Sequence, residues 1–161
     1  MMEALDVRDL LGRPGTSRPV RLERTFDDLA TDLVRVGGPV AMDLRLESVV
    51  EGIFVTGSLS GLRTASCARC LEPVESGFDL RVGELFALDP DDDEYPVEDG
   101  EIGLEPMVRD AVVLAMPFAP LCRPDCRGLC ERCGGNRNRD GCSCPPRVDP
   151  RWAALQELKL D

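Results

Sequence analysis

Histidine is absent from this sequence, and aromatic side chains are scarce. The 161 residues include five Phe, one Tyr and one Trp. Without histidine the chain lacks the usual general base near neutral pH and an imidazole metal ligand, so any metal site must be built from cysteine or carboxylate groups. The shortage of aromatic rings predicts a core made mainly of Val, Leu, Ile and Ala, for which the 43% apolar content suffices.

Long apolar runs are also lacking. The longest stretch without a charged residue, 111–122, has 12 residues and contains Pro117 and Pro120, so it is too short and too broken to span a bilayer. The first nine residues carry four charges and no apolar core of the kind that a secretory signal has. We therefore expect a cytoplasmic protein, in which cysteines serve as metal ligands or redox thiols rather than as structural disulfides.

Basic residues are fewer than acidic residues in this sequence. Thirty acidic residues against 19 basic ones give a formal net charge of −11. This balance argues against a protein that coats nucleic acid or an anionic membrane, because phosphate binding depends on a positive field. At this length one globular domain is expected, with room for no more than a small appended module. Any contact with RNA must then be local or made through a partner.

Alternating apolar and polar residues predict a β-rich domain. Over 40–47 the alternation is typical of a half-buried strand. It continues after residue 52 to Leu59, and further strands are expected near 62–65 and 78–82. Residues 1–26 indicate two short extended pieces around a loop. We expect these strands to form a meander or a partly open barrel.

Three segments predict helices. The first, 26–36, would be a short helix that stops at the following glycines. The second, 104–116, has Pro106 in its first turn and an apolar stripe at helical spacing, which marks a core helix. The third, 149–159, begins with an N-capping aspartate and a proline. The expected fold class is therefore α+β.

Two parts of the chain are distinguished by composition. Residues 1–118 are expected to form the β-rich α+β domain with its core helix and an acidic loop at about 89–101. Residues 119–161 are expected to form a small cysteine-rich, zinc-binding module followed by the terminal helix.

Negative charge is concentrated between residues 79 and 110. This segment has twelve acidic residues and two arginines, a local net charge of −10. A solvated loop explains such a run, a surface for a basic partner is a second explanation, and a cation site is a third, although the register of an EF-hand loop is missing. The candidate partner-binding residues are the central four, Asp91, Asp92, Asp93 and Glu94.

The eight cysteines form four close pairs: Cys67 and Cys70, Cys122 and Cys126, Cys130 and Cys133, Cys142 and Cys144. Four thiolates complete one tetrahedral zinc site, so the four pairs predict two structural Zn²⁺ ions with no open position for catalysis. We favour one ion for the last two pairs and one for the first two. The alternative joins the middle two pairs on one ion, and spacing alone does not decide between them.

Other roles for the cysteines are inert burial and a disulfide or redox function. A redox Cys-x-x-Cys normally begins a helix, whereas Cys67 follows a strand-like run. Arginines surround the C-terminal cysteines, where they either offset thiolate charge or bind nucleic acid. No stacking aromatic is interleaved before Trp152. The candidate partner-binding arginines are Arg123, Arg127, Arg132, Arg137 and Arg139.

Several motifs together resemble the YceD-like family of bacteria and plastids, whose name is "large ribosomal RNA subunit accumulation protein". They are the run Cys67-Ala-Arg-Cys70-Leu-Glu-Pro and the segments Glu105–Pro117, Pro120–Gly134 and Asp149–Leu155. The segment Leu44–Gly52 is similar to the actinobacterial branch. The resemblance implies a role in accumulation or processing of large-subunit (23S) rRNA. It brings no catalytic residues with it, because the family has no established reaction.

Two functions are therefore expected as alternatives. The first is a non-enzymatic ribosome-biogenesis factor with structural zinc, which binds a ribosomal protein of the large subunit, rRNA, or both, and no membrane or small-molecule substrate. The second is a cytosolic thiol redox or zinc-sensing protein, whose cysteines exchange between thiolate, disulfide and metal. An enzyme acting on RNA is a weaker third, because the chain has no histidine base and no two-metal carboxylate arrangement.

Overall fold

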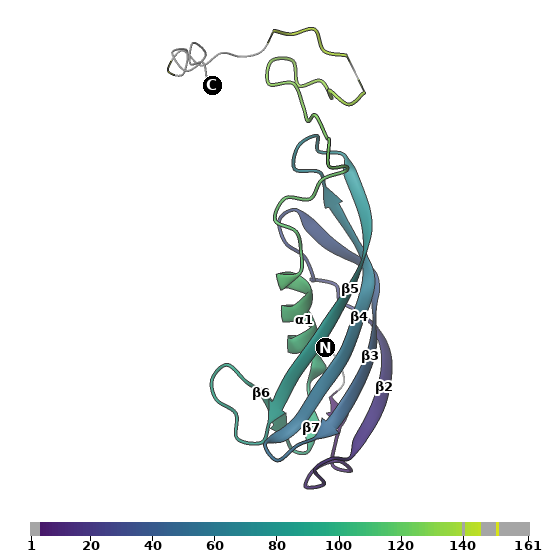
Figure 1. Ribbon diagram of the computed structural model, residues 1–161, viewed down its shortest axis with the longest axis vertical. Coiled ribbons are helices and arrows are strands. Elements are labelled where there is room, and N and C mark those ends of the chain that lie inside the picture. Colours follow the sequence, from purple (N-terminus) through teal and green to yellow (C-terminus); the bar gives the residue numbers. More distant parts are fainter. Residues whose placement is uncertain (1–3, 140, 146–150, 152–161) are drawn as a thin grey trace, which may run out of the picture.

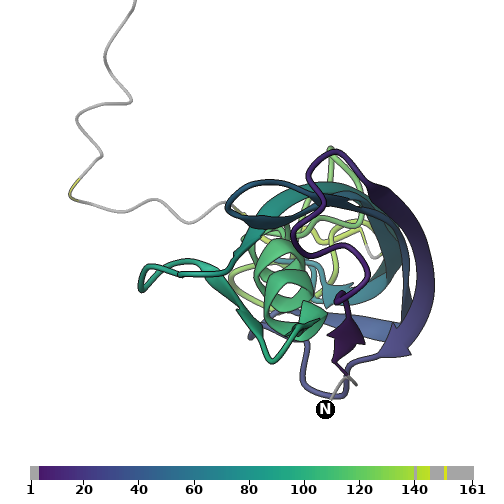
Figure 2. The same ribbon diagram turned by 90° about the horizontal axis from the view of Figure 1, so that it is seen from below.

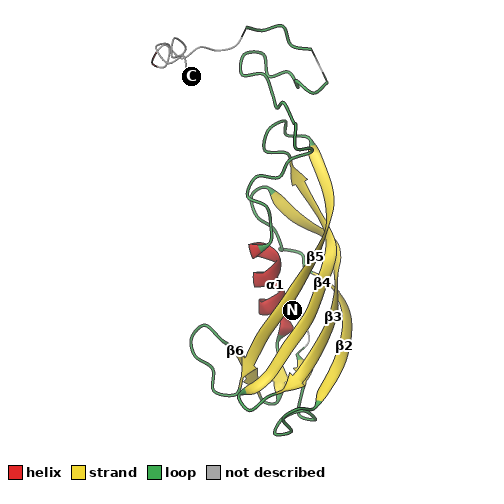
Figure 3. Cartoon of the chain, in the orientation of Figure 1, coloured by secondary structure: helices red, strands yellow, loops and turns green. Residues whose placement is uncertain are grey.

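A computed structural model describes residues 4–139, 141–145 and 151, and its architecture is one curled β-sheet with one helix (Figures 1 and 3). The seven strands lie in the order β1-β7-β6-β5-β4-β3-β2, and every pair is antiparallel except β5 with β6. Their bounds are β1 Leu5–Asp6, β2 Ser17–Thr25, β3 Val34–Ser48, β4 Gly52–Ser66, β5 Pro73–Ala87, β6 Tyr95–Glu98 and β7 Glu101–Ile102.

The predicted alternation determines the faces of the sheet. In β3, Met42, Leu44 and Leu46 are buried on the inner face, whereas Asp43 and Arg45 point outward and are exposed. Side chains alternate with period two in a strand, so this pattern fixes the register against β2 and β4. The separate strands predicted before and after residue 60 are one continuous strand, β4.

The sheet curls into a half-barrel (Figure 2), and a side chain of β2 reaches across its open edge. Its two terminal strands, β1 and β2, do not pair with each other in the described part of the chain. Instead Arg18 of β2 donates to the carbonyl of Asp6 at 2.6 Å and to Asp9 Oδ1 at 3.0 Å. The expected partly open barrel is therefore present.

Helix α1, Leu104–Leu114, lies against the concave face of the sheet (Figure 2). Its buried residues, Leu104, Met107, Val108 and Val112, join the inner residues of the strands in one core. The helix has no basic residue in its last turn. Arg63 of β4 compensates by donating to the carbonyl of Ala115 at 3.2 Å. The core helix predicted over 104–116 is confirmed within two residues.

The helix predicted over 26–36 is wrong. This segment is a turn closed by a bridge between Ala30 and Arg35, and from Val34 onward it belongs to β3. The Thr31 hydroxyl accepts the amide hydrogen of Val34 at 3.2 Å, a local contact that competes with helical hydrogen bonds. Val34 and Val36 are β-branched and pair with β4. Pairing with a long strand thus outweighs a weak helical spacing.

The acidic segment contains more regular structure than expected. Strands β6 and β7 form a hairpin across Asp99 and Gly100, which both have positive φ as a type I′ turn requires. Only residues 88–94 remain as an exposed loop without regular structure. The C-terminal helix predicted over 149–159 falls almost entirely outside the described residues. No helix in the described part of the chain is long and apolar enough to cross a membrane.

We predict that Gly57→Ala lowers the free energy of unfolding by more than about 1 kcal/mol. Gly57 has a φ of 151°, and a Cβ there would collide with the carbonyl of Asp43 and lie 2.8 Å from Leu44 Cα. Gly77→Ala is the matched control, because the nearest atom to its added Cβ is 3.8 Å away. Denaturant unfolding would measure both, and equal stabilities would contradict the prediction.

Candidate metal centres

The structure gathers all eight cysteines into two groups of four. The first is Cys67, Cys70, Cys122 and Cys126, and the second is Cys130, Cys133, Cys142 and Cys144. Within each group the four sulfur atoms lie within 4.8 Å of one another, and all eight are free thiols. This is the grouping favoured from the sequence, and the arrangement that joins the two middle pairs does not occur.

The first group connects the sheet to the segment after α1. Cys67 and Cys70 lie in the turn between β4 and β5, and the other two cysteines follow the helix. The amide of Ala68 donates to the carbonyl of Pro120 at 2.7 Å, which brings the two segments together. Three of the four cysteines are buried, and Val74, Leu121 and Leu129 pack around them. This apolar cluster is separate from the main core.

Both Cys-x-x-Cys motifs adopt the same turn. In the first motif, the amide of Leu71 donates to the Cys67 carbonyl and the amide of Cys67 donates to the Glu72 carbonyl, both at 2.9 Å. In the second motif, the amide of Gly134 donates to the Cys130 carbonyl and the amide of Cys130 donates to the Gly135 carbonyl, both at 2.8 Å. The turn needs a left-handed residue after the second cysteine, so Leu71 has a φ of 61° and Gly134 one of 70°. We call these two turns the knuckles.

The knuckles aim amide hydrogens at sulfur. Burial alone would raise the pKa of the Cys67 thiol, but the amides of Cys122, Cys70 and Arg69 lower this pKa to about 6. The amides of Cys133 and Arg132 lower the pKa of Cys130 to about 6. Burial raises the pKa of Cys122 to about 12, and a hydrogen bond that the Cys144 thiol donates to the sulfur of Cys142 raises the pKa of Cys144 to about 12. Each group thus contains at least one sulfur whose thiolate form is favoured by hydrogen bonds.

The sulfur positions suit a tetrahedral metal ion. The distance is 3.8 Å between the sulfurs of Cys67 and Cys126, and 3.6 Å between those of Cys70 and Cys122. In the second group, Cys142 lies 3.2 Å from Cys130 and 3.5 Å from Cys133. A tetrahedral ion with metal–sulfur bonds of about 2.3 Å separates its ligands by about 3.8 Å. Both groups therefore have the donor atoms and approximate spacing that a four-thiolate ion requires.

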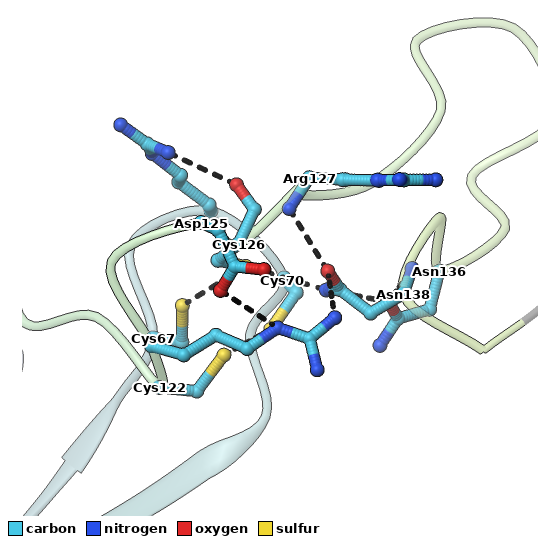
Figure 4. Close-up of polar contacts among 10 residues, drawn as sticks. Cys67, Cys70, Cys122, Asp125, Cys126, Arg127, Asn136 and Asn138 are labelled. Atoms are coloured by element: carbon cyan, nitrogen blue, oxygen red, sulfur yellow. Dashed lines mark hydrogen bonds and ion pairs between the residues drawn. The ribbon is translucent and has the colours of Figure 1, made fainter.

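Two asparagines from the loop of the second group lie among the polar contacts around the first group (Figure 4), an arrangement not predicted from the sequence. Asn138, from the loop of the second group, donates through Nδ2 to the sulfur of Cys126 at 3.3 Å. Asn136 is buried and donates to Glu72 Oε1 at 3.1 Å. Arg69 donates to the carbonyl of Cys126 at 2.9 Å. Two asparagines in the short gap between Cys133 and Cys142 were the available signal, although turn chemistry explained them equally well.

The predicted partner-binding residues lie in two places. Asp91, Asp92, Asp93 and Glu94 are all exposed in the loop after β5, whereas the arginines surround the cysteines at the opposite end of that strand (Figure 1). Three of the five arginines hold the cysteine segment together: Arg123 contacts Asp125 and Asn138, Arg139 pairs with Glu72, and Arg137 reaches the sulfur of Cys130. All five arginines are exposed, and the side chains of Arg127 and Arg132 make no hydrogen bond or ion pair with another described residue.

Comparison with known proteins gives one family match. The family model described as "Large ribosomal RNA subunit accumulation protein YceD" matches residues 55–159, which include all eight cysteines. No solved structure matches the chain significantly.

Relatives occur in actinobacteria and plants. An uncharacterized protein of Mycobacterium tuberculosis (strain ATCC 25618 / H37Rv) is 40% identical over 130 residues, which are 76% of this chain and 63% of that protein. One from Mycobacterium leprae (strain TN) is 36% identical over 166 residues, covering 95% of this chain and 76% of its own. The Zea mays protein "Large ribosomal RNA subunit accumulation protein YCED homolog 1, chloroplastic" is 27% identical over 140 residues, 65% of this chain and 45% of that protein. The chain thus spans a little under two thirds of the M. tuberculosis relative.

The stability of the two knuckles should respond differently to reciprocal substitutions at the left-handed position. We expect Gly134→Ala to lower the free energy of unfolding by about 1 kcal/mol, because an L-residue is disfavoured in the left-handed region. Leu71→Gly should leave it unchanged or raise it by less than about 1 kcal/mol, because relief of the left-handed strain is partly offset by the greater chain entropy of glycine. The side chain of Leu71 is 65% exposed, so little packing is lost. Thermal unfolding of both variants measures this, and shifts of the same sign would contradict it.

Proposed function

Because the chain belongs to the YceD family of large ribosomal RNA subunit accumulation proteins, we propose that it supports accumulation or processing of 23S rRNA in the cytoplasm as a non-enzymatic factor. The family match is the observation that carries this proposal. The plant relative named above carries the same description. Within this function, the cysteine groups stabilise the fold and the acidic loop binds the partner.

The metal in both groups is zinc, in the same proposal. Thiolates are soft ligands that suit Zn²⁺, and four of them fill its coordination sphere. With no position left for water or substrate, the ion supplies folding free energy rather than a Lewis acid. Cys67, Cys70, Cys122 and Cys126 would hold one ion, and Cys130, Cys133, Cys142 and Cys144 the other. The first ion would then fix the segment after α1 to the end of the sheet, and the second would close a loop within that segment.

The direct partner in this proposal is a basic protein of the large ribosomal subunit. The four acidic side chains of residues 91–94 are exposed, and none makes an ion pair with another described residue. Such a loop attracts a cationic protein and repels phosphate. At the other end, Arg127 and Arg132 are the candidate arginines whose side chains make no hydrogen bond or ion pair with another described residue, and they offer at most a small local contact for rRNA phosphates.

Thiol chemistry is the alternative function, and one observation favours it. The sulfurs of Cys130 and Cys142 are 3.2 Å apart, and the pKa of Cys130 is lowered to about 6, so a reactive thiolate has a neighbouring thiol. Metal content separates the two functions. Bound zinc with unreactive thiols supports the structural role, whereas reactive thiols in a metal-free, folded protein would support the redox role.

We expect protein purified in reduced form and without chelator to carry about two Zn²⁺ per chain. Replacing both Cys67 and Cys70 by serine, or both Cys142 and Cys144, should reduce this to about one, because two remaining thiolates no longer form a cage. Ser143→Ala is the control for the second site, since it changes an exposed side chain between two ligands. Elemental analysis measures the content, and well under one zinc in the unmodified protein would contradict the proposal.

Neutralising the acidic loop should weaken capture of the protein partner. The variant Asp91→Asn, Asp92→Asn, Asp93→Asn and Glu94→Gln should recover several-fold less of a basic large-subunit protein in affinity purification at low salt, and treatment with RNase should not change this. The reason is the loss of long-range attraction, which salt also screens.

A matched control removes four other negative charges from the outer face of the sheet. It is Glu23→Gln, Glu47→Gln, Glu75→Gln and Asp79→Asn, all at exposed positions. If this control loses as much partner as the loop variant, net charge rather than the loop is responsible. Recovery of rRNA alone, abolished by RNase, would refute protein as the direct partner.

A further inference from the structure

Asn136 and Asn138 lie between two cysteines of the second group, Cys133 and Cys142, but contact the first group and its surroundings (Figure 4). Asn138 Nδ2 lies 3.3 Å from the sulfur of Cys126. The amide of Arg137 also donates to the carbonyl of Gly128 at 3.0 Å. Residues 136–138 therefore pack against the stretch 127–129 that separates the two groups along the chain.

The amide group of Asn138 is oriented by its other contacts. Its Oδ1 accepts hydrogen bonds from the Arg127 amide at 2.9 Å and from Arg123 Nη2 at 2.8 Å. Only donors surround this oxygen, so the NH₂ group must be the one that faces Cys126. Its amide and Nδ2 also donate to Asn136 Oδ1, at 2.9 and 3.0 Å. One hydrogen of the NH₂ group is thus directed at a ligand sulfur.

Asn136 connects this arrangement to the first knuckle. It is 7% exposed and donates to Glu72 Oε1, while the Glu72 carbonyl accepts the amide hydrogen of Cys67. Leu129 and Asn136 form an isolated β-bridge, which holds the loop against the stretch between the groups. Contacts at Cys126 and at Glu72 therefore join the loop of the second group to the first group.

We propose that the two cysteine sites load metal as one coupled unit, in which Asn138 stabilises the metal-bound form of the first site only while the second site holds its own ion. An ion on Cys133 and Cys142 closes the loop at both ends, which reduces the chain entropy lost when Asn138 and Asn136 dock. Without that ion the loop is tethered at one end. The hydrogen bond to the Cys126 thiolate then no longer outweighs the cost of ordering the loop.

The coupling has a definite size and direction. Outer hydrogen-bond partners of metal ligands typically contribute 10–100-fold in metal affinity, so loss of Asn138 should weaken the first site by about this factor. By linkage, an ion in the first site must strengthen the second site equally. This inference rests on the zinc sites of the proposed function.

The test is a double-mutant cycle on the full chain, with affinity for Zn²⁺ measured by competition with a chromophoric chelator. Cadmium-113 NMR of Cd²⁺-loaded protein identifies which site is occupied, since each four-thiolate site gives its own resonance. The cycle combines Asn138→Ala with Cys142→Ser/Cys144→Ser, which removes the second site. Asn138→Asp serves as a second variant, because it keeps the acceptor for Arg123 and Arg127 but places a carboxylate oxygen opposite the sulfur. Ser143→Ala is the control.

With the second site intact, Asn138→Ala and Asn138→Asp should each weaken the first site about 10–100-fold. Removing the second site should weaken the first site similarly, and Asn138→Ala should then add nothing. An equal loss from Asn138→Ala in both backgrounds, or no loss in either, would overturn the coupling while leaving two zinc sites in place. A wild-type chain that binds no zinc would refute the metal assignment itself, and the coupling with it.

Discussion

Four sulfur atoms from stretches of chain more than fifty residues apart have to meet within a few ångströms, and this requirement determines how the segment after α1 is placed. The first pair lies at the end of β4 and the second follows the helix, so the group closes a loop that contains β5, β6, β7 and α1. The apolar cluster around it is small: three buried cysteines with Val74, Leu121 and Leu129. Such a cluster buries too little surface to hold a segment by itself, and a metal-thiolate bond network is the usual substitute.

The position of the first cysteine group also places it far from the acidic loop. Strand β5 begins beside the first cysteine group and ends at the acidic loop, so the two chemically distinct regions lie at opposite ends of one strand (Figure 1). In the proposed function each divalent ion with four thiolates would carry a net charge of −2, and three of the five candidate arginines contact acceptors around the cysteine groups. These arginines would then mainly balance the thiolate charge, which leaves the exposed acidic loop as the surface for a charged partner.

Local patterns in the sequence predicted much of this structure. The alternation of Val40, Met42, Leu44 and Leu46 predicted β3, and the apolar stripe around Met107 and Val108 predicted α1. Four cysteine pairs without histidine predicted two all-thiol groups, and the favoured grouping is the one found, although spacing alone also allowed the two middle pairs to share an ion. The turn over 26–33 was not predicted, because the conformation of this segment depends on the pairing of Val34 and Val36 with a strand about thirty residues later. The role of Asn138 was missed for a similar reason: its partner, Cys126, belongs to the other cysteine group, and turn chemistry accounted for the asparagine locally.

The central claim is that metal holds the cysteine segment in place while the curled sheet folds by its own apolar core. Hydrogen exchange of the reduced protein before and after removal of metal with a strong chelator tests this most directly. The account predicts that amides of Leu129, Cys130 and Gly134 lose their protection, whereas those in the centres of β3, β4 and α1 keep theirs. Unchanged protection of residues 126–139 after complete metal removal would contradict the account.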